Sequence, residues 1–595
     1  MDREAAKPLG MVAAIGVAYG GLQAWLAIRD GADPLAMVAL IAGVVGLVAL
    51  LGAGGWWMWR SRHRDDSPGA RELDKAARHL ARHSQLTGIT ESQARRSSAR
   101  LRRAEGAPGD SPDGWGMPLG ELVGDGRMLR ASWESSVMII AGTRTGKSTS
   151  YAIPLVVGAP GAVIATSNKP DVYAGTWRVR RDGGHREWLF DPQSIAGTAK
   201  PGFRLDPLVV VRDPETAMEL AGHFVAAAKT DNAVGSSYFD GASHKALGSY
   251  ILAAALAGGD MLHVAEWLNR PTLDLPARVL AAHGFAALAQ SVAEMNNLND
   301  RQQQGVYGMA QQFMEVMSSP GYAAWVCPAT RAVISSSPAG GGTDRGGYFA
   351  TDADDDREVF DPAAFVASTD TLYAISRDND GSPKALVTAL VGMVMRAGGE
   401  QAATMPGGRL GEPVVAVLDE AANICKLREL PGMLSYAGGI GICLVPIIQS
   451  RQQGERVWGR GGFGEMWGVA NAKVYLGGNH DADFAAELSR LVGEHERTRE
   501  NKSYGGKGGK SWSQSVTREP ILPADRLAAM PLGRGLLLSS GNRPALIKTR
   551  PWFRGEHAEA IRASQDAFTS TEQDLPATGE PVAAATAATR KEQQP

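Results

Sequence analysis

Cysteine is scarce in this chain, and net charge is nearly absent. Among 595 residues the only cysteines are Cys327, Cys425 and Cys443. An odd count at wide spacing supplies neither a disulfide framework nor a zinc-ligand pattern, so buried, reduced thiols in a cytosolic domain are expected. The formal net charge is −2. Bulk charge therefore gives no support for a nucleic-acid partner, and any such contact must come from a local patch or a lined channel.

Charged side chains are also missing from two long apolar runs near the start of the chain. Residues 9–28 and 34–59 carry none, and each run exceeds the roughly 20 residues that a helix needs to cross a bilayer. Five residues separate the runs, so residues 1–60 are predicted to form a transmembrane hairpin. The alternative for the first run, a cleaved signal peptide, lacks a small-residue cleavage site before the second run. Three arginines follow the second run: Arg60, Arg62 and Arg64. Because positive residues favour the cytoplasmic side of a membrane, both chain ends are expected in the cytoplasm.

A basic juxtamembrane region, residues 61–124, follows the hairpin. Between positions 60 and 104, twelve Lys and Arg residues stand against five acidic ones. Attraction to anionic lipid headgroups is the favoured interpretation of this excess. Contact with a nucleic-acid substrate is the alternative.

A glycine-rich loop follows the short apolar run 137–141. The order of strand, loop and helix is the context that a phosphate-binding P-loop requires. Backbone N–H groups of such a loop surround the β-phosphate of ATP, the lysine reaches the β- and γ-phosphates, and the next hydroxyl binds Mg²⁺. Ala141 stands where the motif has its first glycine. The predicted nucleotide-binding residues are Gly142, Thr143, Arg144, Thr145, Gly146, Lys147, Ser148 and Thr149.

Two further apolar runs end in polar residues. Run 414–418 precedes Asp419 and Glu420, and run 440–448 precedes Gln449. We expect Asp419 to hold Mg²⁺ together with Ser148, Glu420 to orient the attacking water, and Gln449 to sense the γ-phosphate. An exposed acidic pair and a strand-end amide are the plainer alternatives. The predicted catalytic residues are Lys147, Asp419, Glu420 and Gln449, and the predicted cofactors are ATP and Mg²⁺.

These segments, taken in order, resemble the TraG/TraD family of type IV coupling proteins. The resemblance covers roughly residues 125–555. It is carried by AGTRTGKST at 141–149, LDEAANICKL at 418–427, IIQSRQQGERVWG at 447–459, the segment 471–496, and ILPADRLAAMP at 521–531.

The resemblance implies an α/β fold: a RecA-like P-loop NTPase core with an inserted all-α domain, preceded by the two-helix transmembrane hairpin. The core would span residues 125–258 and 348–555, with the insertion at 259–347. It further implies a homohexamer on the inner membrane that couples ATP hydrolysis to export through a type IV secretion channel. The substrate would be single-stranded DNA with its relaxase, or a secreted protein.

The chain departs from the family in one respect that matters for hydrolysis. Family members often carry an arginine before the strand of Gln449, where this chain has Ala437, Gly438 and Gly439. Arg428 and Arg451 are the candidate substitutes for this cation.

Two segments and two rival functions stay open. Residues 501–515 are expected to form a Gly/Lys/Ser loop, either solvated or in contact with single-stranded nucleic acid. Residues 556–595 are expected to be a disordered tail. The rival functions are an FtsK/HerA-like double-stranded DNA translocase and a non-catalytic membrane scaffold for substrate recruitment.

Overall fold

The computed structural model describes residues 67–101, 112–197, 200–228, 237–334, 349–351, 353–379, 381–504 and 510–573. The predicted transmembrane runs 9–28 and 34–59 lie outside these residues. Within the described part of the chain, no helix is both long and apolar enough to span a membrane. The chain divides into two compact units, Met1–Arg71 and Glu72–Pro595, and the fold described here is that of the second.

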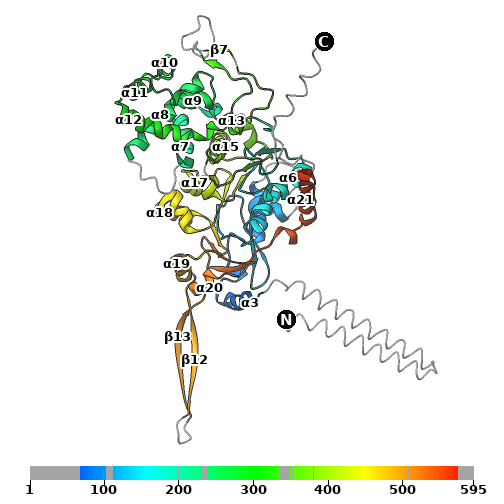
Figure 1. Ribbon diagram of the computed structural model, residues 1–595. Coiled ribbons are helices and arrows are strands. Elements are labelled where there is room, and N and C mark those ends of the chain that lie inside the picture. The colour runs from blue at the N-terminus through cyan, green and yellow to red at the C-terminus, as the bar shows by residue number, and fades with distance from the viewer. Residues whose placement is uncertain are drawn as a thin grey trace, which may run out of the picture. The chain divides into compact units, whose positions relative to one another are not determined.

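An eleven-stranded sheet runs through the second unit (Figure 1), in the order β2-β1-β15-β14-β11-β3-β10-β9-β4-β8-β5. The seven strands from β11 to β5 are parallel. The four at the other end pair antiparallel. The predicted α/β class with a parallel-rich sheet is thereby confirmed. The strands are β1 Met117–Leu122, β2 Met128–Ala131, β3 Val137–Ile140, β4 Val163–Ser167, β5 Glu187–Phe190, β8 Thr371–Ile375, β9 Val414–Leu418, β10 Ile442–Ile448, β11 Ala472–Tyr475, β14 Arg534–Ser539 and β15 Ala545–Lys548.

The central strands are apolar along their whole length because both faces of the sheet are covered. Every residue of β3, β9 and β10 is buried. Successive side chains of a strand point to opposite faces. Met138 and Ile140 accordingly join one hydrophobic cluster, while Val137 and Ile139 join a second. Continuous apolar runs are what parallel strands between two helical layers require.

One face of the sheet is covered by helices α5 Ile153–Gly158, α6 Asp171–Asp182 and α21 Ala558–Gln573. The other face carries most of the remaining helices. These are α7 Pro214–Ala228, α15 Lys384–Thr404, α16 Ala421–Ile424, α17 Leu430–Tyr436, α18 Arg451–Val469 and α19 Ala482–Val492, with shorter α14 Pro362–Val366 and α20 Ala524–Ala528. Helix α4 Glu91–Leu101 packs near β2.

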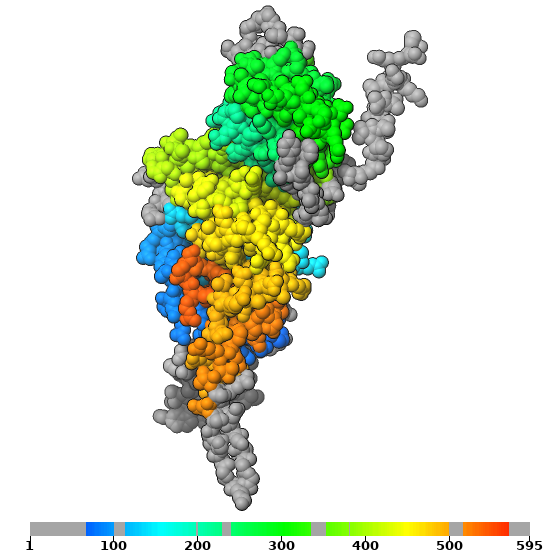
Figure 2. All heavy atoms as spheres, turned by 90° about the vertical axis from the view of Figure 1, so that its left-hand side faces the viewer, coloured from blue at the N-terminus to red at the C-terminus, as the bar shows by residue number. Residues whose placement is uncertain are grey.

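A group of helices continues from α7, away from the sheet. Helix α8 is its centre and packs against α7, α9, α10, α11 and α12. Helix α7 in turn packs on α15, which lies on the sheet. Figure 2 shows these helices in green and teal, above the yellow surface of α17 and α18. The helices are α8 Ser237–Leu256, α9 Met261–Leu268, α10 Leu275–Ala282, α11 Ala286–Asn296, α12 Asp300–Phe313 and α13 Pro320–Val326.

The expectation of a disordered tail is wrong for the first part of that segment, because residues 558–573 form α21. Ile561, Ser564 and Phe568 are buried and recur at intervals of three and four, so they line one face of the helix. The Ser564 hydroxyl also donates to the carbonyl of Ala174 on α6, at 2.7 Å. Few apolar side chains of α21 are needed to hold this helix in place, because α6 supplies the opposite surface of the contact.

The expected loop over residues 501–515 is also wrong over most of its length. Residues on both sides of 505–509 form a hairpin of two eleven-residue strands, β12 Glu494–Tyr504 and β13 Lys510–Pro520. The strands pair only with each other and extend away from the main sheet (Figure 1). The hydrogen bonds of an antiparallel pair join backbone groups and do not depend on the side chains. A polar sequence can therefore form two strands without showing an apolar strand pattern. The small strands β6 Val333–Ile334 and β7 Phe349–Thr351 form a second pair.

Candidate nucleotide-binding site

Strand order brings the three predicted motifs to one place. Strand β10 lies between β3 and β9, and all three run parallel. Their carboxyl ends therefore meet at one edge of the sheet, where open α/β sheets bind ligands. The loop after β3 carries Lys147, β9 ends before Asp419 and Glu420, and β10 ends before Gln449.

The loop after β3 is packed too tightly for a side chain at Gly142. A Cβ atom on Gly142 would lie 2.1 Å from the carbonyl oxygen of Gly478. The Gly142 N–H donates to the carbonyl of Gly477 at 2.9 Å, which ties the loop to the segment after β11. Gly146 has φ +89° and Arg144 has φ +61°, so the loop turns through left-handed positions. Such turns make a concave row of backbone N–H groups that suits an anion.

Ala141 fits the place where the motif has its first glycine. Its N–H donates to the carbonyl of Ile448 at 3.0 Å, which continues the pairing of β3 with β10, and its side chain is fully buried. Ser148 begins a short π-helical turn, Ser148–Ala152, that leads into α5. The Thr149 hydroxyl donates to the carbonyl of Gly146 at 3.1 Å and fixes the start of that helix.

Lys147 lies between the two carboxylates. Its Nζ is 2.9 Å from Oδ1 of Asp419 and also bonds Oε1 of Glu420. Burial alone would lower the pKa of Lys147, but the charges of Asp419 and Glu420 raise its pKa above the ordinary value. Burial raises the pKa of Asp419, and the nearby Lys147 charge opposes that rise. The Ser148 hydroxyl is 3.3 Å from Oδ2 of Asp419, so the two predicted metal-binding oxygens are adjacent.

Glu420 is held in a left-handed backbone conformation, with φ +58° and ψ +36°. Such a conformation costs of order 1–3 kcal/mol in a residue other than glycine and is found mainly at functional sites. Gln449 Nε2 donates to both carboxylate oxygens of Glu420, at 3.0 and 2.9 Å. Asn423 Nδ2 donates to Oε2 at 3.0 Å. The carboxylate is therefore fixed from two sides.

Two residues that hold this network together, Asn423 and Gln453, were not predicted from the sequence. Gln453 on α18 donates through Nε2 to Oδ1 of Asn423 at 2.5 Å, and its Oε1 accepts from the backbone N–H of Gln449 at 2.9 Å. Both residues stand in the segments quoted for the family resemblance. The available signals were the amide in the apolar stretch after Glu420 and the four-residue spacing from Gln449 to Gln453.

The two candidate cations lie apart from this network. Arg451 pairs with Glu455 at 2.6 Å and with Glu487 at 2.8 Å. Arg428 is exposed and lines a separate cavity beside α7. A role for either cation at the nucleotide of a neighbouring copy stays a prediction.

The donor set fits a nucleotide with Mg²⁺. The Ser148 hydroxyl and the Asp419 carboxylate lie 3.3 Å apart, next to the glycine-rich loop and Lys147. Both supply oxygen atoms, which are the ligands that Mg²⁺ prefers. Because the glycine-rich loop, Lys147 and the two predicted Mg²⁺ ligands meet at the carboxyl edge of a parallel sheet, the fold and the site define the class of P-loop NTPases.

Two protein-family models match parts of this chain. The family described as Type IV secretory system Conjugative DNA transfer matches residues 93–243. The family described as TraM recognition site of TraD and TraG matches residues 413–532. The two matched regions, in chain order, resemble the conjugative DNA-transfer and TraD/TraG families of type IV coupling proteins.

Solved structures with a similar arrangement are distant in sequence. The bacterial conjugative coupling protein TrwBdeltaN70, in an unbound monoclinic form, is 15% identical over 79% of this chain and 94% of its own, with a TM-score of 0.49. Plasmid coupling protein TrwB in complex with ADP and Mg²⁺ is 14% identical over 79% and 94%, with a TM-score of 0.45. VirB4 of Thermoanaerobacter pseudethanolicus is 13% identical over 77% and 99%, with a TM-score of 0.42. No curated protein sequence matches the chain.

Proposed function

We propose that this protein is a membrane-anchored ATPase that couples ATP hydrolysis to the delivery of a substrate into a type IV secretion channel. The substrate is single-stranded DNA with its bound relaxase, or a secreted protein. The observation that carries the proposal is that one chain of hydrogen bonds joins four side chains: Asp419 to Lys147, Lys147 to Glu420, and Glu420 to Gln449.

Each side chain has a role that follows from its position. The loop 142–149 surrounds the phosphates, and Lys147 moves from the two carboxylates to the β- and γ-phosphate oxygens. Ser148 and Asp419 would hold Mg²⁺, which would neutralise charge on the phosphates. Glu420, fixed by Gln449 and Asn423, accepts a hydrogen bond from the attacking water and aligns it with the γ-phosphate. The products are ADP and inorganic phosphate.

The proposal extends to the architecture. The eleven-stranded sheet with its covering helices forms the RecA-like core, the helical group centred on α8 forms the insertion that meets substrate, and residues 1–60 form the two-span anchor in the inner membrane. The insertion therefore begins at Ser237 and not at the predicted residue 259, because α8 packs at the centre of that group, and the core begins before the predicted residue 125, because β1 lies in the sheet. The juxtamembrane region ends before β1, which belongs to the sheet, both chain ends are cytoplasmic, and six copies assemble into a ring. The two family matches support this arrangement, because residues 93–243 and 413–532 lie before and after most of the helical group.

The test is ATP hydrolysis by full-length protein in lipid nanodiscs, with Lys147→Ala beside Lys245→Ala as control. Lys245 is exposed on α8, far along the chain from the loop. We expect Lys147→Ala to lower hydrolysis at least a hundredfold, since it removes the cation that meets the transferred phosphoryl group. Lys245→Ala is expected to keep the wild-type rate.

Substrate transfer between cells that carry these variants should follow hydrolysis. Transfer that survives Lys147→Ala would contradict the motor role. Absence of hydrolysis in the wild-type protein would favour the non-catalytic scaffold. Stimulation by double-stranded DNA alone would favour the FtsK/HerA-like translocase.

A further inference from the structure

A cavity of about 650 Å³ lies between α7, α17 and α18. This volume is within the usual range of ligand sites, roughly 300–1,000 Å³. The cavity is separate from the nucleotide site, and the roles proposed above make no use of it. Figure 2 shows the face on which the yellow surface of α17 and α18 meets the helices above.

Positive charge predominates in the lining. Lys426, Arg428 and Arg456 line the cavity, and Glu465 is the acidic residue among its lining side chains. The chain as a whole carries a formal charge of −2, so this is a local concentration of positive charge. A basic cavity on a nearly neutral protein attracts a polyanion to that part of the surface.

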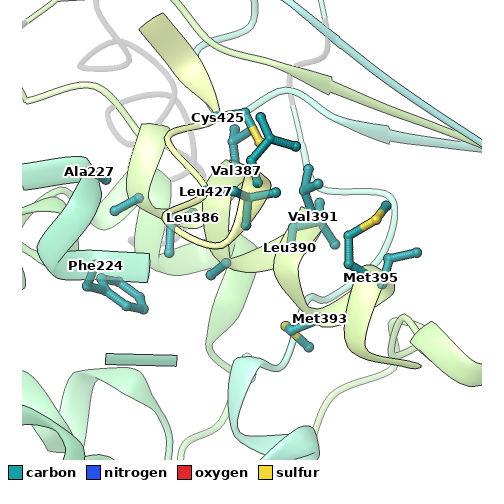
Figure 3. Packing of buried hydrophobic residues seen from close by; sticks show 14 of the residues in the cluster. Phe224, Ala227, Leu386, Val387, Leu390, Val391, Met393, Met395, Cys425 and Leu427 are labelled. Carbon is teal, nitrogen blue, oxygen red and sulfur yellow. The ribbon is translucent and has the colours of Figure 1, made fainter. Parts of the chain in front are cut away.

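The backbone after α16 aims two of these cations into the cavity. Cys425 and Leu427 are buried, and Figure 3 shows them beside Val387 of α15, with Phe224 and Ala227 of α7 nearby. The residues that alternate with them, Lys426 and Arg428, are half-buried and exposed. The apolar pair therefore anchors the segment while the basic pair faces the opening.

An aromatic side chain stands in the same wall. The indole N–H of Trp458 donates to the carbonyl of Leu427 at 2.7 Å, which fixes the ring against the segment that carries Arg428. Gly459, with φ +73°, breaks α18 immediately afterwards. Basic residues combined with an aromatic ring are the features with which proteins hold single-stranded nucleic acid, because a base can stack while phosphates pair with the cations.

We propose that this cavity binds single-stranded nucleic acid, with a base stacked on Trp458 and phosphates held by Arg428 and Arg456. The inference rests on the proposed function and names where its DNA substrate contacts this chain. Duplex DNA fits the cavity less well, since its bases are already stacked in pairs.

Two of the elements that line the cavity also hold the network around Glu420. The segment of Lys426 and Arg428 continues α16, where Asn423 bonds Glu420. Arg456 and Trp458 lie on α18 within two turns of Gln453, which bonds Asn423. A strand seated in the cavity would touch both elements that fix the catalytic carboxylate. We therefore expect strand binding to change the rate of hydrolysis.

The experiment uses full-length protein in nanodiscs and a fluorescein-labelled oligo-dT of about 30 nucleotides. Arg428→Ala/Arg456→Ala is compared with Arg460→Ala, a control on the same helix whose side chain is 90% exposed and lies outside the cavity lining. Affinity is measured at several salt concentrations. Loss of two phosphate contacts should lower the slope of log K against log salt by about 1.4.

The double variant should weaken binding at least tenfold, while Arg460→Ala stays near wild type. Arg428→Lys/Arg456→Lys should restore most of the salt slope, because charge is kept. Trp458→Leu should weaken binding about tenfold without changing the slope. Stimulation of hydrolysis by oligo-dT should fall in the double variant, and thermal midpoints show whether each variant is folded.

Binding and salt slope equal to those of Arg460→Ala would overturn the inference. If the wild-type protein hydrolyses ATP in that case, the proposed function stands and only the site is wrong. If the wild-type protein hydrolyses ATP but binds no oligo-dT, the nucleic-acid site is overturned. If it hydrolyses no ATP, the proposed function itself fails.

Discussion

His223 on α7 is a buried titratable side chain that faces α15. It is buried, its Nδ1 is 4.0 Å from a carboxylate oxygen of Glu429, and within the described residues that nitrogen has no hydrogen-bond partner. A Cβ on Gly392 of α15 would lie 2.2 Å from its Nε2. Burial lowers the pKa of His223 to about 4, and Glu219 opposes part of this shift. The helix that joins the helical group to the sheet therefore depends on a neutral imidazole.

This burial predicts an acid-sensitive stability. Between pH 6.5 and 4 the unfolded chain binds a proton at His223 that the folded chain does not, so stability falls as the pH drops through that window. At pH 5 the contribution amounts to a loss of about 2 kcal/mol relative to pH 7. We expect His223→Gln to weaken the pH dependence of the unfolding free energy by this amount, measured by denaturant titration at both pH values.

His480 supplies the matched control for that measurement. It is exposed, so His480→Gln should keep the wild-type dependence on pH. Equal pH dependence in all three proteins would show that folding leaves the pKa of His223 unchanged, which would contradict the prediction.

At the scale of elements, the network around Glu420 shows why sequence reasoning found only part of the site. Lys147, Asp419 and Glu420 were predictable because strand, loop and acidic pair are local patterns. Gln449 was placed at a strand end, but its contact with Glu420 depends on β10 lying beside β9. Gln453 was missed, because its partner Asn423 lies thirty residues away in sequence.

Helix α21 gives a prediction at the same scale. Ile561 is buried against α6, where a Cβ on Gly175 would lie 3.5 Å from its Cγ2. Ile561→Ala removes these contacts and should cost about 2–4 kcal/mol of local stability. Hydrogen exchange across residues 558–573 should accelerate accordingly.

Arg562 is the neighbouring control, since its side chain is exposed. Arg562→Ala should leave exchange across α21 within the error of the wild type. Fast exchange across this segment in the wild-type protein would restore the expectation of a disordered tail.

At the scale of the whole molecule, the proposed ring makes hydrolysis a property of several copies. Glu420→Gln keeps the shape of the side chain but removes the carboxylate that aligns water. Mixed with wild-type protein before assembly, it tests whether copies act together. Independent copies at a one-to-one ratio would retain about half of the activity. If one inactive copy stops a ring of six, only a few per cent remains, on the order of one half to the sixth power.

The readout is the ATP hydrolysis rate as a function of the Glu420→Gln fraction at constant total protein. A linear decline would contradict concerted action in a ring. Lys245→Ala protein keeps the nucleotide-binding loop intact. Mixing it with wild-type protein should therefore leave the ATP hydrolysis rate unchanged at every ratio.

The sequence by itself determined the local chemistry of this protein. Apolar runs, a glycine-rich loop and acidic or amide residues at strand ends predicted a P-loop site and an α/β fold, because each pattern lies within a few residues of chain. The tertiary structure decided which of those patterns meet. It placed β10 between β3 and β9, turned residues 558–573 into a packed helix, and gathered Arg428, Arg456 and Trp458 around one cavity. These features depend on contacts between segments that are distant in sequence, and a local sequence pattern does not determine which distant segments will meet.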